Sequence, residues 1–114
     1  MAELEELDLY DIAQGIMEDR ERIKANMEVI WRLAREKSEN ELTYKKAYAA
    51  TVEKLRQDKL PATIIKEIAE GEVAEAKRDW ELASSKYRAS LASLEALQTS
   101  MQALQSMLRY LDKV

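Results

Sequence analysis

A heptad pattern fills the second half of the sequence. Between Ala69 and Leu111, apolar or small side chains recur at alternating spacings of four and three residues over six heptads without interruption. The positions are Ala69, Val73, Ala76, Trp80, Ala83, Tyr87, Ser90, Leu94, Leu97, Met101, Leu104, Leu108 and Leu111. A β-strand would require a period of two instead. The pattern therefore predicts one long helix over 61–112, whose heptad seam packs on another helix.

The first half carries the same spacing, but polar residues interrupt it. Its apolar positions are Leu9, Ile12, Ile16, Ile23, Met27, Ile30, Ala34, Tyr48, Val52 and Leu55. Arg20, Lys37 and Glu41 stand where the seam would require apolar side chains. The spacing still predicts a second long helix, over 8–56.

Local signals set the predicted boundaries of these helices. Asp8 is a good N-cap for the first helix, which leaves an acidic tail over 1–7. A turn is expected over 57–61, because the residue before Pro61 is disfavoured in helical geometry. Two long helices joined by a short turn form an antiparallel hairpin. We therefore predict an all-α protein with a single helical-hairpin domain over 8–114.

Composition excludes several classes of fold and chemistry. The 114 residues include two Gly and one Pro, too few for the turns of a β-sandwich or barrel. Without Cys or His, the chain cannot form disulfides, thiol nucleophiles, zinc sites with the usual ligands or an imidazole acid–base pair. Di-iron bundles also require Glu-x-x-His motifs. We therefore expect no cofactor, no metal and no enzymatic activity.

The sequence also bears on the expected compartment. No apolar run approaches the ~18 residues of a transmembrane helix. The N-terminus is acidic, where a signal peptide requires positive charge. These features predict a soluble cytoplasmic protein that does not bind a membrane.

The stretch 90–108 contains more apolar side chains than one seam can use. Glu95 is its only charged residue. A surplus of exposed apolar surface marks an interface, which predicts a homo-oligomer, a dimer or higher, with a four-helix bundle as the simplest form. The predicted interface residues are Leu91, Leu94, Leu97, Met101, Leu104, Met107 and Leu108. In the alternative interpretation, Leu91 and Met107 only flank a wide seam.

Aromatic and methionine side chains allow two interpretations. A stacking platform for nucleic-acid bases is one reading of Trp31, Tyr44, Trp80 and Tyr87. Their helical spacing favours core packing, in which alanines let the helices approach and aromatic rings fill the layers between them. Core packing is also the first interpretation of Met17, Met27, Met101 and Met107.

Charge is distributed unevenly along the chain, whose net charge is -4. Residues 1–19 contain seven acids and no base. Residues 45–66 contain two acids and six bases, namely Lys45, Lys46, Lys54, Arg56, Lys59 and Lys66. In a hairpin these bases lie at the closed end, where they could contact nucleic-acid phosphates or an acidic protein surface. A solvated helix face remains the alternative, because no Gly-rich phosphate loop accompanies them.

The stretch Asp58–Leu111 carries four distinctive local sequences. They are Leu60-Pro61-Ala62-Thr63, Ile65-Lys66, Gly71-Glu72-Val73-Ala74 and the closing run Ser106-Met107-Leu108-Arg109-Tyr110-Leu111. In these features the stretch resembles small helical proteins of tailed bacteriophages and prophages. Such proteins tend to be encoded beside genes for recombination and single-strand binding. The resemblance implies a phage context, with the host cytoplasm as the compartment, and brings no catalytic residue with it.

Three functions are compatible with these features. The leading hypothesis is a non-enzymatic coiled-coil accessory or adaptor of phage origin in DNA recombination or replication, with a protein partner and possible contact to nucleic acid. The second is a phage inhibitor that blocks a host defence or host enzyme by covering its surface, with the acids of 3–19 as contacts. The third is a structural spacer in a larger assembly.

Overall fold

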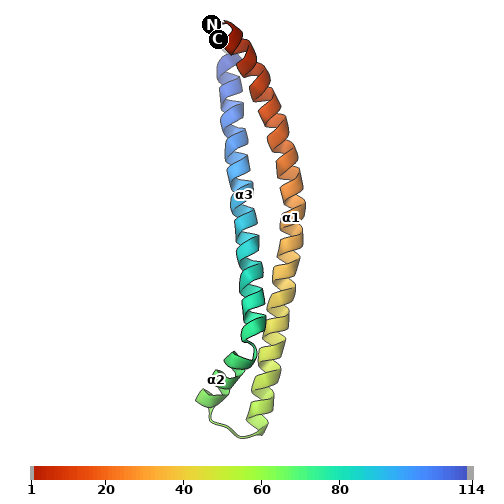
Figure 1. The fold of residues 1–114 in the computed structure, drawn as a ribbon, viewed down its shortest axis with the longest axis vertical. Coiled ribbons are helices and arrows are strands. Elements are labelled where there is room, and N and C mark those ends of the chain that lie inside the picture. Colours follow the sequence, from red (N-terminus) through yellow and green to blue (C-terminus); the bar gives the residue numbers. More distant parts are fainter. Residues whose placement is uncertain (1, 113–114) are drawn as a thin grey trace. The chain divides into compact units, whose positions relative to one another are not determined.

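The computed structural model describes the backbone of residues 2–112 and the side chains of residues 9–111. Its elements are α1 (Ala2–Gln57), α2 (Ala62–Glu72) and α3 (Ala74–Asp112) (Figure 1). No strand occurs within residues 2–112. The prediction of an all-α fold is therefore confirmed.

The beginning of α1 differs from the sequence prediction. The helix starts at Ala2, so Asp8 is an internal helical residue and 1–7 does not form a separate tail over its described part. The reason is local, because residues 2–8 contain no Gly or Pro and consist largely of Ala, Glu and Leu, which are strong helix formers. Their propensity outweighs the capping signal of Asp8.

A short turn over 58–61 connects α1 to α2, as predicted. Lys59 closes α1 in a left-handed conformation, with a φ of 57°, and its backbone N–H donates to the carbonyl of Arg56 at 3.0 Å. Pro61 is the N-cap of α2, and its carbonyl accepts a hydrogen bond from the N–H of Ile65 at 3.0 Å. The turn thus ends one helix and starts the next within a few residues.

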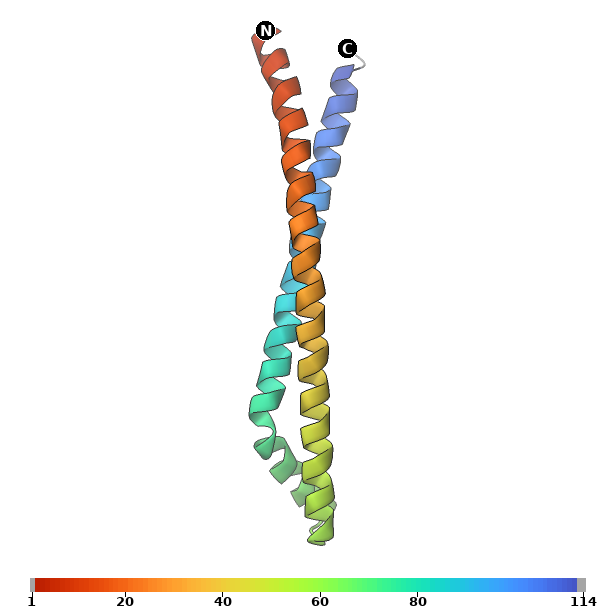
Figure 2. The same cartoon turned by 90° about the vertical axis from the view of Figure 1, so that its right-hand side faces the viewer.

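The predicted helix over 61–112 is broken at Val73, which separates α2 from α3 (Figures 1 and 2). Val73 leaves helical geometry, with φ -101° and ψ 12°, although its N–H still donates to the carbonyl of Ala69 at 3.1 Å. Gly71, two residues earlier, has a low helix propensity and weakens the helix at this point. The heptad pattern does not reveal the break, because Ala69 before it, Val73 at it and Ala83 after it are all buried.

Replacing Gly71 by alanine is expected to raise the free energy of unfolding by about 0.5–1 kcal/mol, since alanine is the better helix former. A Cβ at Gly71 meets no atom within 4 Å. Gly15→Ala is the matched control, because its Cβ would lie 3.0 Å from Cδ1 of Leu104. Urea unfolding followed by circular dichroism should show a smaller gain, or a loss, for Gly15→Ala. Equal gains would contradict the close packing at Gly15.

The predicted single domain divides into two compact units. Unit 1 combines α1 up to Ile30 with α3 from Ala89 onwards, and unit 2 is Trp31–Arg88. Unit 2 therefore contains the end of α1, all of α2 and the start of α3. α1 and α3 each run through both units.

The helices of unit 1 pack antiparallel. Asn26 contacts Ser90, and Asp19, earlier in α1, contacts Ser100, later in α3. In unit 2 the same order appears, since Lys37 lies over the ring of Tyr87, and Tyr44, later in α1, stacks on Trp80, earlier in α3. Within each unit, α1 and α3 thus form an antiparallel pair.

The predicted seam of the second half is confirmed, because each of its positions from Ala69 to Leu111 is buried or half-buried. On α1, the seam of unit 1 follows Ile12, Ile16, Asp19, Ile23, Asn26 and Ile30. The prediction was wrong at Arg20 and Met27, which are exposed, because Asp19 and Asn26 hydrogen-bond across the pair and can occupy seam positions. Leu9, which was also predicted in the seam, is 39% exposed.

Only small parts of the described chain are deeply buried. The buried apolar residues are Ile12, Leu33, Ile65, Ala69, Val73 and Ala83. No large side chain among the described residues is below 2% exposed. A helix pair covers one stripe of each helix, so most apolar side chains keep an edge in solvent.

Candidate functional site

The basic corner of unit 2 consists of Lys45, Lys46, Lys54, Arg56, Lys59 and Lys66. All six side chains are exposed. Among the side chains of residues 9–111, an ion pair is found for Lys45, whose Nζ lies 3.0 Å from Oε1 of Glu41. The other five cations have no carboxylate of these residues within 4.0 Å and present their charge to solvent.

The α1–α2 turn brings part of the basic corner together. Arg56, in the last turn of α1, and Lys66, in α2, line one shallow groove whose apolar wall includes Tyr48 and Ile65. Lys59 lies in the turn between them. This groove combines two cations with an apolar surface, which suits a partner with anionic and apolar groups.

Lys45 and Lys46 belong to a separate part of the corner. They precede Lys54 by about two helical turns, or roughly 12 Å along α1. The exposed acids Glu53 and Asp58 lie within the same stretch and reduce its positive charge. The basic corner can thus make several single contacts to a polyanion, without the compact geometry of a phosphate loop.

The aromatic side chains of the seam pack on one another. Tyr44 stacks on Trp80 with an interplanar angle of 21°, and Tyr48 follows at 6.2 Å from Tyr44. Lys37 lies over the ring of Tyr87, with Nζ 5.2 Å from the centroid. These half-buried rings fill the seam as predicted and do not form an open platform for bases.

Trp31 and three methionines depart from the predicted core packing. Trp31 is 70% exposed, and Met17, Met27 and Met107 are 64%, 43% and 52% exposed. Met101 alone of the four methionines discussed above is half-buried in the seam. For the exposed Trp31, Met17, Met27 and Met107, the helical spacing did not distinguish a position in the seam from a position beside it.

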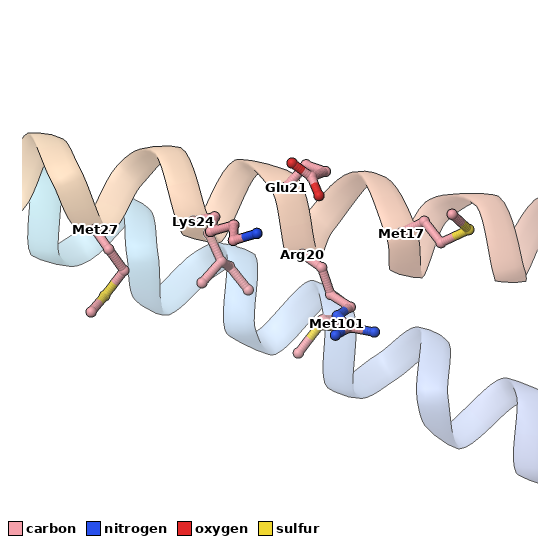
Figure 3. A pocket seen from close by; sticks show the side chains of 7 residues that line it. Met17, Arg20, Glu21, Lys24, Met27 and Met101 are labelled. Carbon is pink, nitrogen blue, oxygen red and sulfur yellow. The ribbon is translucent and has the colours of Figure 1, made fainter.

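A shallow groove on unit 1 collects two of these methionines. Met17, Arg20, Lys24 and Met27 of α1 line it, together with Met101 of α3 (Figure 3). Arg20 extends from α1 toward Met101 of α3, and both side chains line the groove. Arg20 is exposed, so its charge is not buried in the apolar seam.

The predicted oligomer interface divides into two sets. Leu94, Leu97, Met101, Leu104 and Leu108 are half-buried at seam positions of the chain's own helix pair. Leu91 and Met107 are 39% and 52% exposed. Most of the predicted residues therefore have a role inside unit 1, and self-association through them remains a prediction.

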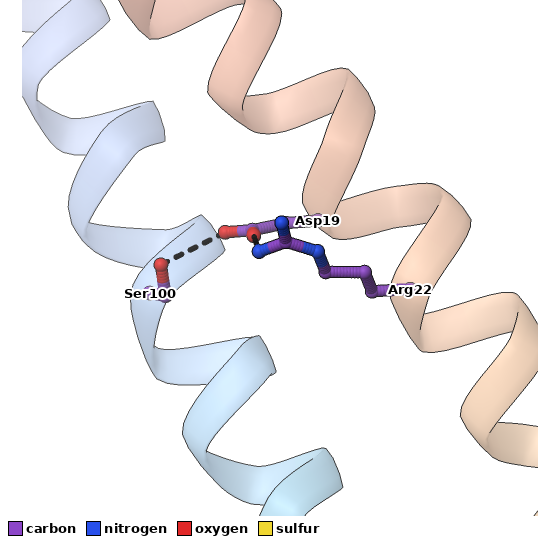
Figure 4. Close-up of polar contacts among 3 residues, drawn as sticks. All are labelled: Asp19, Arg22 and Ser100. Carbon is purple, nitrogen blue, oxygen red and sulfur yellow. Dashed lines mark hydrogen bonds and ion pairs between the residues drawn. The ribbon is translucent and has the colours of Figure 1, made fainter.

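Polar contacts cross the seam of unit 1 at two levels. The hydroxyl of Ser100 donates to Oδ2 of Asp19 at 2.8 Å, and Arg22 Nη1 lies 3.9 Å from Oδ1 (Figure 4). Asp19 is only 5% exposed. Farther along, Ser90 donates to the side-chain oxygen of Asn26 at 3.4 Å. These contacts satisfy polar groups that the helix pair would otherwise bury unpaired.

The described residues present no constellation with evident chemistry. No group of three or more acids within them could hold a metal ion. Comparison with protein families, curated proteins and solved structures finds no match. Among the described residues, no helix combines the length and apolarity needed to span a bilayer. The exposed surfaces of the two units are therefore the features of the described residues that bear on function.

One surface was missed in the sequence prediction. A second run of alternating four- and three-residue spacings lies on α3 beside the seam, and all its members are uncharged and exposed. We call it the outer stripe, and it consists of Ala89, Ser93, Ala96, Ser100, Ala103, Met107 and Tyr110. The same heptad count, started at Ala89, would have found it.

Proposed function

We propose that the protein is a non-enzymatic helical adaptor that contacts a polyanionic partner through the basic corner, with the sugar–phosphate backbone of DNA as the first candidate. The observation that supports this is the exposure of all six cations of the corner in a chain of net charge -4. A chain that is acidic as a whole repels DNA, so contact requires a local concentration of positive charge.

The process and the compartment belong to the same proposal. The resemblance of 58–111 to small phage proteins encoded near recombination genes favours DNA recombination or replication in the host cytoplasm. The resembling stretch includes Lys59 and Lys66 of the basic corner.

The triple variant Lys54→Ser, Arg56→Ser, Lys59→Ser is expected to abolish DNA binding without changing the melting temperature, since exposed charges contribute little to stability. For four neutralised phosphates of duplex DNA, the logarithm of the affinity falls with a slope of about -3.6 against the logarithm of salt concentration. Fluorescence anisotropy of labelled single- and double-stranded DNA at low salt measures both effects.

The matched control changes three exposed lysines outside the basic corner. Lys24→Ser, Lys77→Ser, Lys86→Ser lowers the net charge by the same three units and should retain most of the binding. If wild type fails to bind either DNA at tens of micromolar protein, the DNA proposal is refuted. Equal losses in the two triple variants would show that net charge alone, and not the corner, governs binding.

A second candidate function is inhibition of a host protein by an acidic helix. The observation in its favour is that α1 begins at Ala2, so the acids of 3–19 belong to a helix. Asp11 and Glu18 are exposed, whereas Asp19 is buried and is not available to a partner. An acidic helix can occupy a nucleic-acid-binding surface by presenting carboxylates in place of phosphates.

Affinity capture from a host lysate, with and without nuclease, distinguishes the two candidates. Partners that disappear after nuclease treatment support the adaptor that contacts DNA. A single stoichiometric protein that persists after nuclease treatment, and that the variant Asp11→Asn, Glu18→Gln loses, supports the inhibitor.

A further inference from the structure

The outer stripe has a gradient of side-chain size along α3. Its first positions, Ala89 and Ser93, are small, whereas its last two, Met107 and Tyr110, are large. Met107 is 52% and Tyr110 71% exposed, so the large end presents substantial apolar surface to solvent. Such a face fits a neighbouring helix whose side chains are large opposite the small end of the stripe and small opposite its large end.

We infer that the outer stripe binds the outer stripe of a second copy of this chain, with the two α3 helices antiparallel about a two-fold axis. Antiparallel pairing places Ala89 opposite Tyr110 of the second copy and Ser93 opposite its Met107. Ala96 then lies opposite Ala103, where two small side chains allow close approach. Parallel pairing would instead place Tyr110 on Tyr110 and leave the small ends without a partner.

Polar and charged groups at the centre of the stripe are compatible with this contact. The hydroxyl of Ser100 already donates to Asp19, so covering it leaves no unpaired donor. The charged residues of α3 that adjoin the stripe in sequence are Arg88, Glu95 and Arg109, and all three are exposed. Each lies about 100° around the helix from its neighbour in the stripe. A partner therefore meets an uncharged surface along the whole stripe.

Charge complementarity on α1 favours a second copy over an unrelated helix. Arg22 lies on the same side of unit 1 as Ser100, since both contact Asp19 (Figure 4). The two-fold axis near Ser100 therefore passes close to the level of Asp19 on α1. Exposed Glu18 lies on one side of that level and exposed Arg22 on the other. The axis brings Glu18 of each copy within about 3 Å, measured along the helix axis, of the level of Arg22 of the other.

The first test measures the association state of the full chain by sedimentation equilibrium. Wild type is expected to dimerise, and Ala96→Glu is expected to weaken the dimer by about 100-fold or more, because two carboxylates would be buried where small side chains meet. Its helicity should not change, since Ala96 is exposed in the single chain. Gln98→Glu adds the same charge about 200° around the helix and should dimerise like wild type. A monomeric wild type, or equal behaviour of the two variants, overturns the proposal.

The second test determines the direction of pairing. The chain has no Cys, so single cysteines can be introduced without competing thiols. Ala96→Cys mixed with Ala103→Cys should form a disulfide between the two variants. Each variant alone should not, because its two cysteines are offset by about 10 Å along the helix axis, beyond the ~7 Å reach between Cα atoms. A disulfide in each separate sample and none between the variants overturns antiparallel pairing.

Discussion

Replacing Leu104 by glutamate is expected to lower the free energy of unfolding by about 3 kcal/mol. Leu104 is a seam residue of unit 1, and its Cδ1 occupies the space above Gly15, 3.0 Å from where a Cβ would lie. A carboxylate at this position loses the packing on α1 and places a charge beside an apolar seam. Thermal and urea unfolding, followed by circular dichroism, measure the loss.

Gln102→Glu is the control for this substitution. It adds the same negative charge two residues away on α3, at an exposed position. Surface substitutions of this kind change stability by about 0.5 kcal/mol or less. Similar losses for Leu104→Glu and Gln102→Glu would contradict the assignment of Leu104 to the seam.

The second large effect is expected at Trp80. Trp80→Ala should lower the free energy of unfolding by about 3 kcal/mol. This value is at the low end for tryptophan, because the side chain of Trp80 is half-buried. The substitution removes the stack on Tyr44 and opens a space in the seam of unit 2. Trp80→Phe keeps an aromatic ring there and should recover part of the loss.

The other tryptophan provides a matched comparison. Trp31 is 70% exposed, so Trp31→Ala should change stability by about 0.5 kcal/mol or less. Each variant retains one tryptophan, whose fluorescence reports unfolding independently of circular dichroism. A larger effect at Trp31 than at Trp80 would contradict the assignment of Trp80 to the seam and of Trp31 to the exposed surface.

The seam of the second half, in α2 and α3, could be predicted because its pattern is regular. From Ala69 to Leu111 no charged residue occupies a seam position, and hydrophobic periodicity alone places every member. On α1, Asp19 and Asn26 occupy seam positions. The count of apolar residues placed Met27 in the seam instead, and its spacing placed Arg20 there as a polar interruption. Polar residues can be placed in a seam only when their partners across it are known.

The break at Val73 could not be predicted for a different reason. Both sides of the break bury their apolar residues, so the spacing is the same with or without it. Gly71 was the only local signal, and a single glycine is tolerated in many helices.

The candidate sites were predictable to different extents. The six cations of the basic corner were placed by counting charges, and their exposure follows from long charged side chains on a helix pair. The approach of Arg56 and Lys66 to one groove depends on the geometry of the turn and on the separate helix α2, neither of which the charge pattern contains.

The two polar contacts across unit 1 also restrict how its helices can slide past one another. A heptad seam repeats, so a shift by seven residues preserves most apolar contacts. Such a shift would place Asn26 opposite Ala83 or Leu97, neither of which has a donor for its side-chain oxygen. The shift that places Asn26 opposite Leu97 would also place Asp19 opposite Met107. Misaligned helix pairs that form early in folding would thus bury unpaired polar groups and reopen, which leaves one alignment as the stable product.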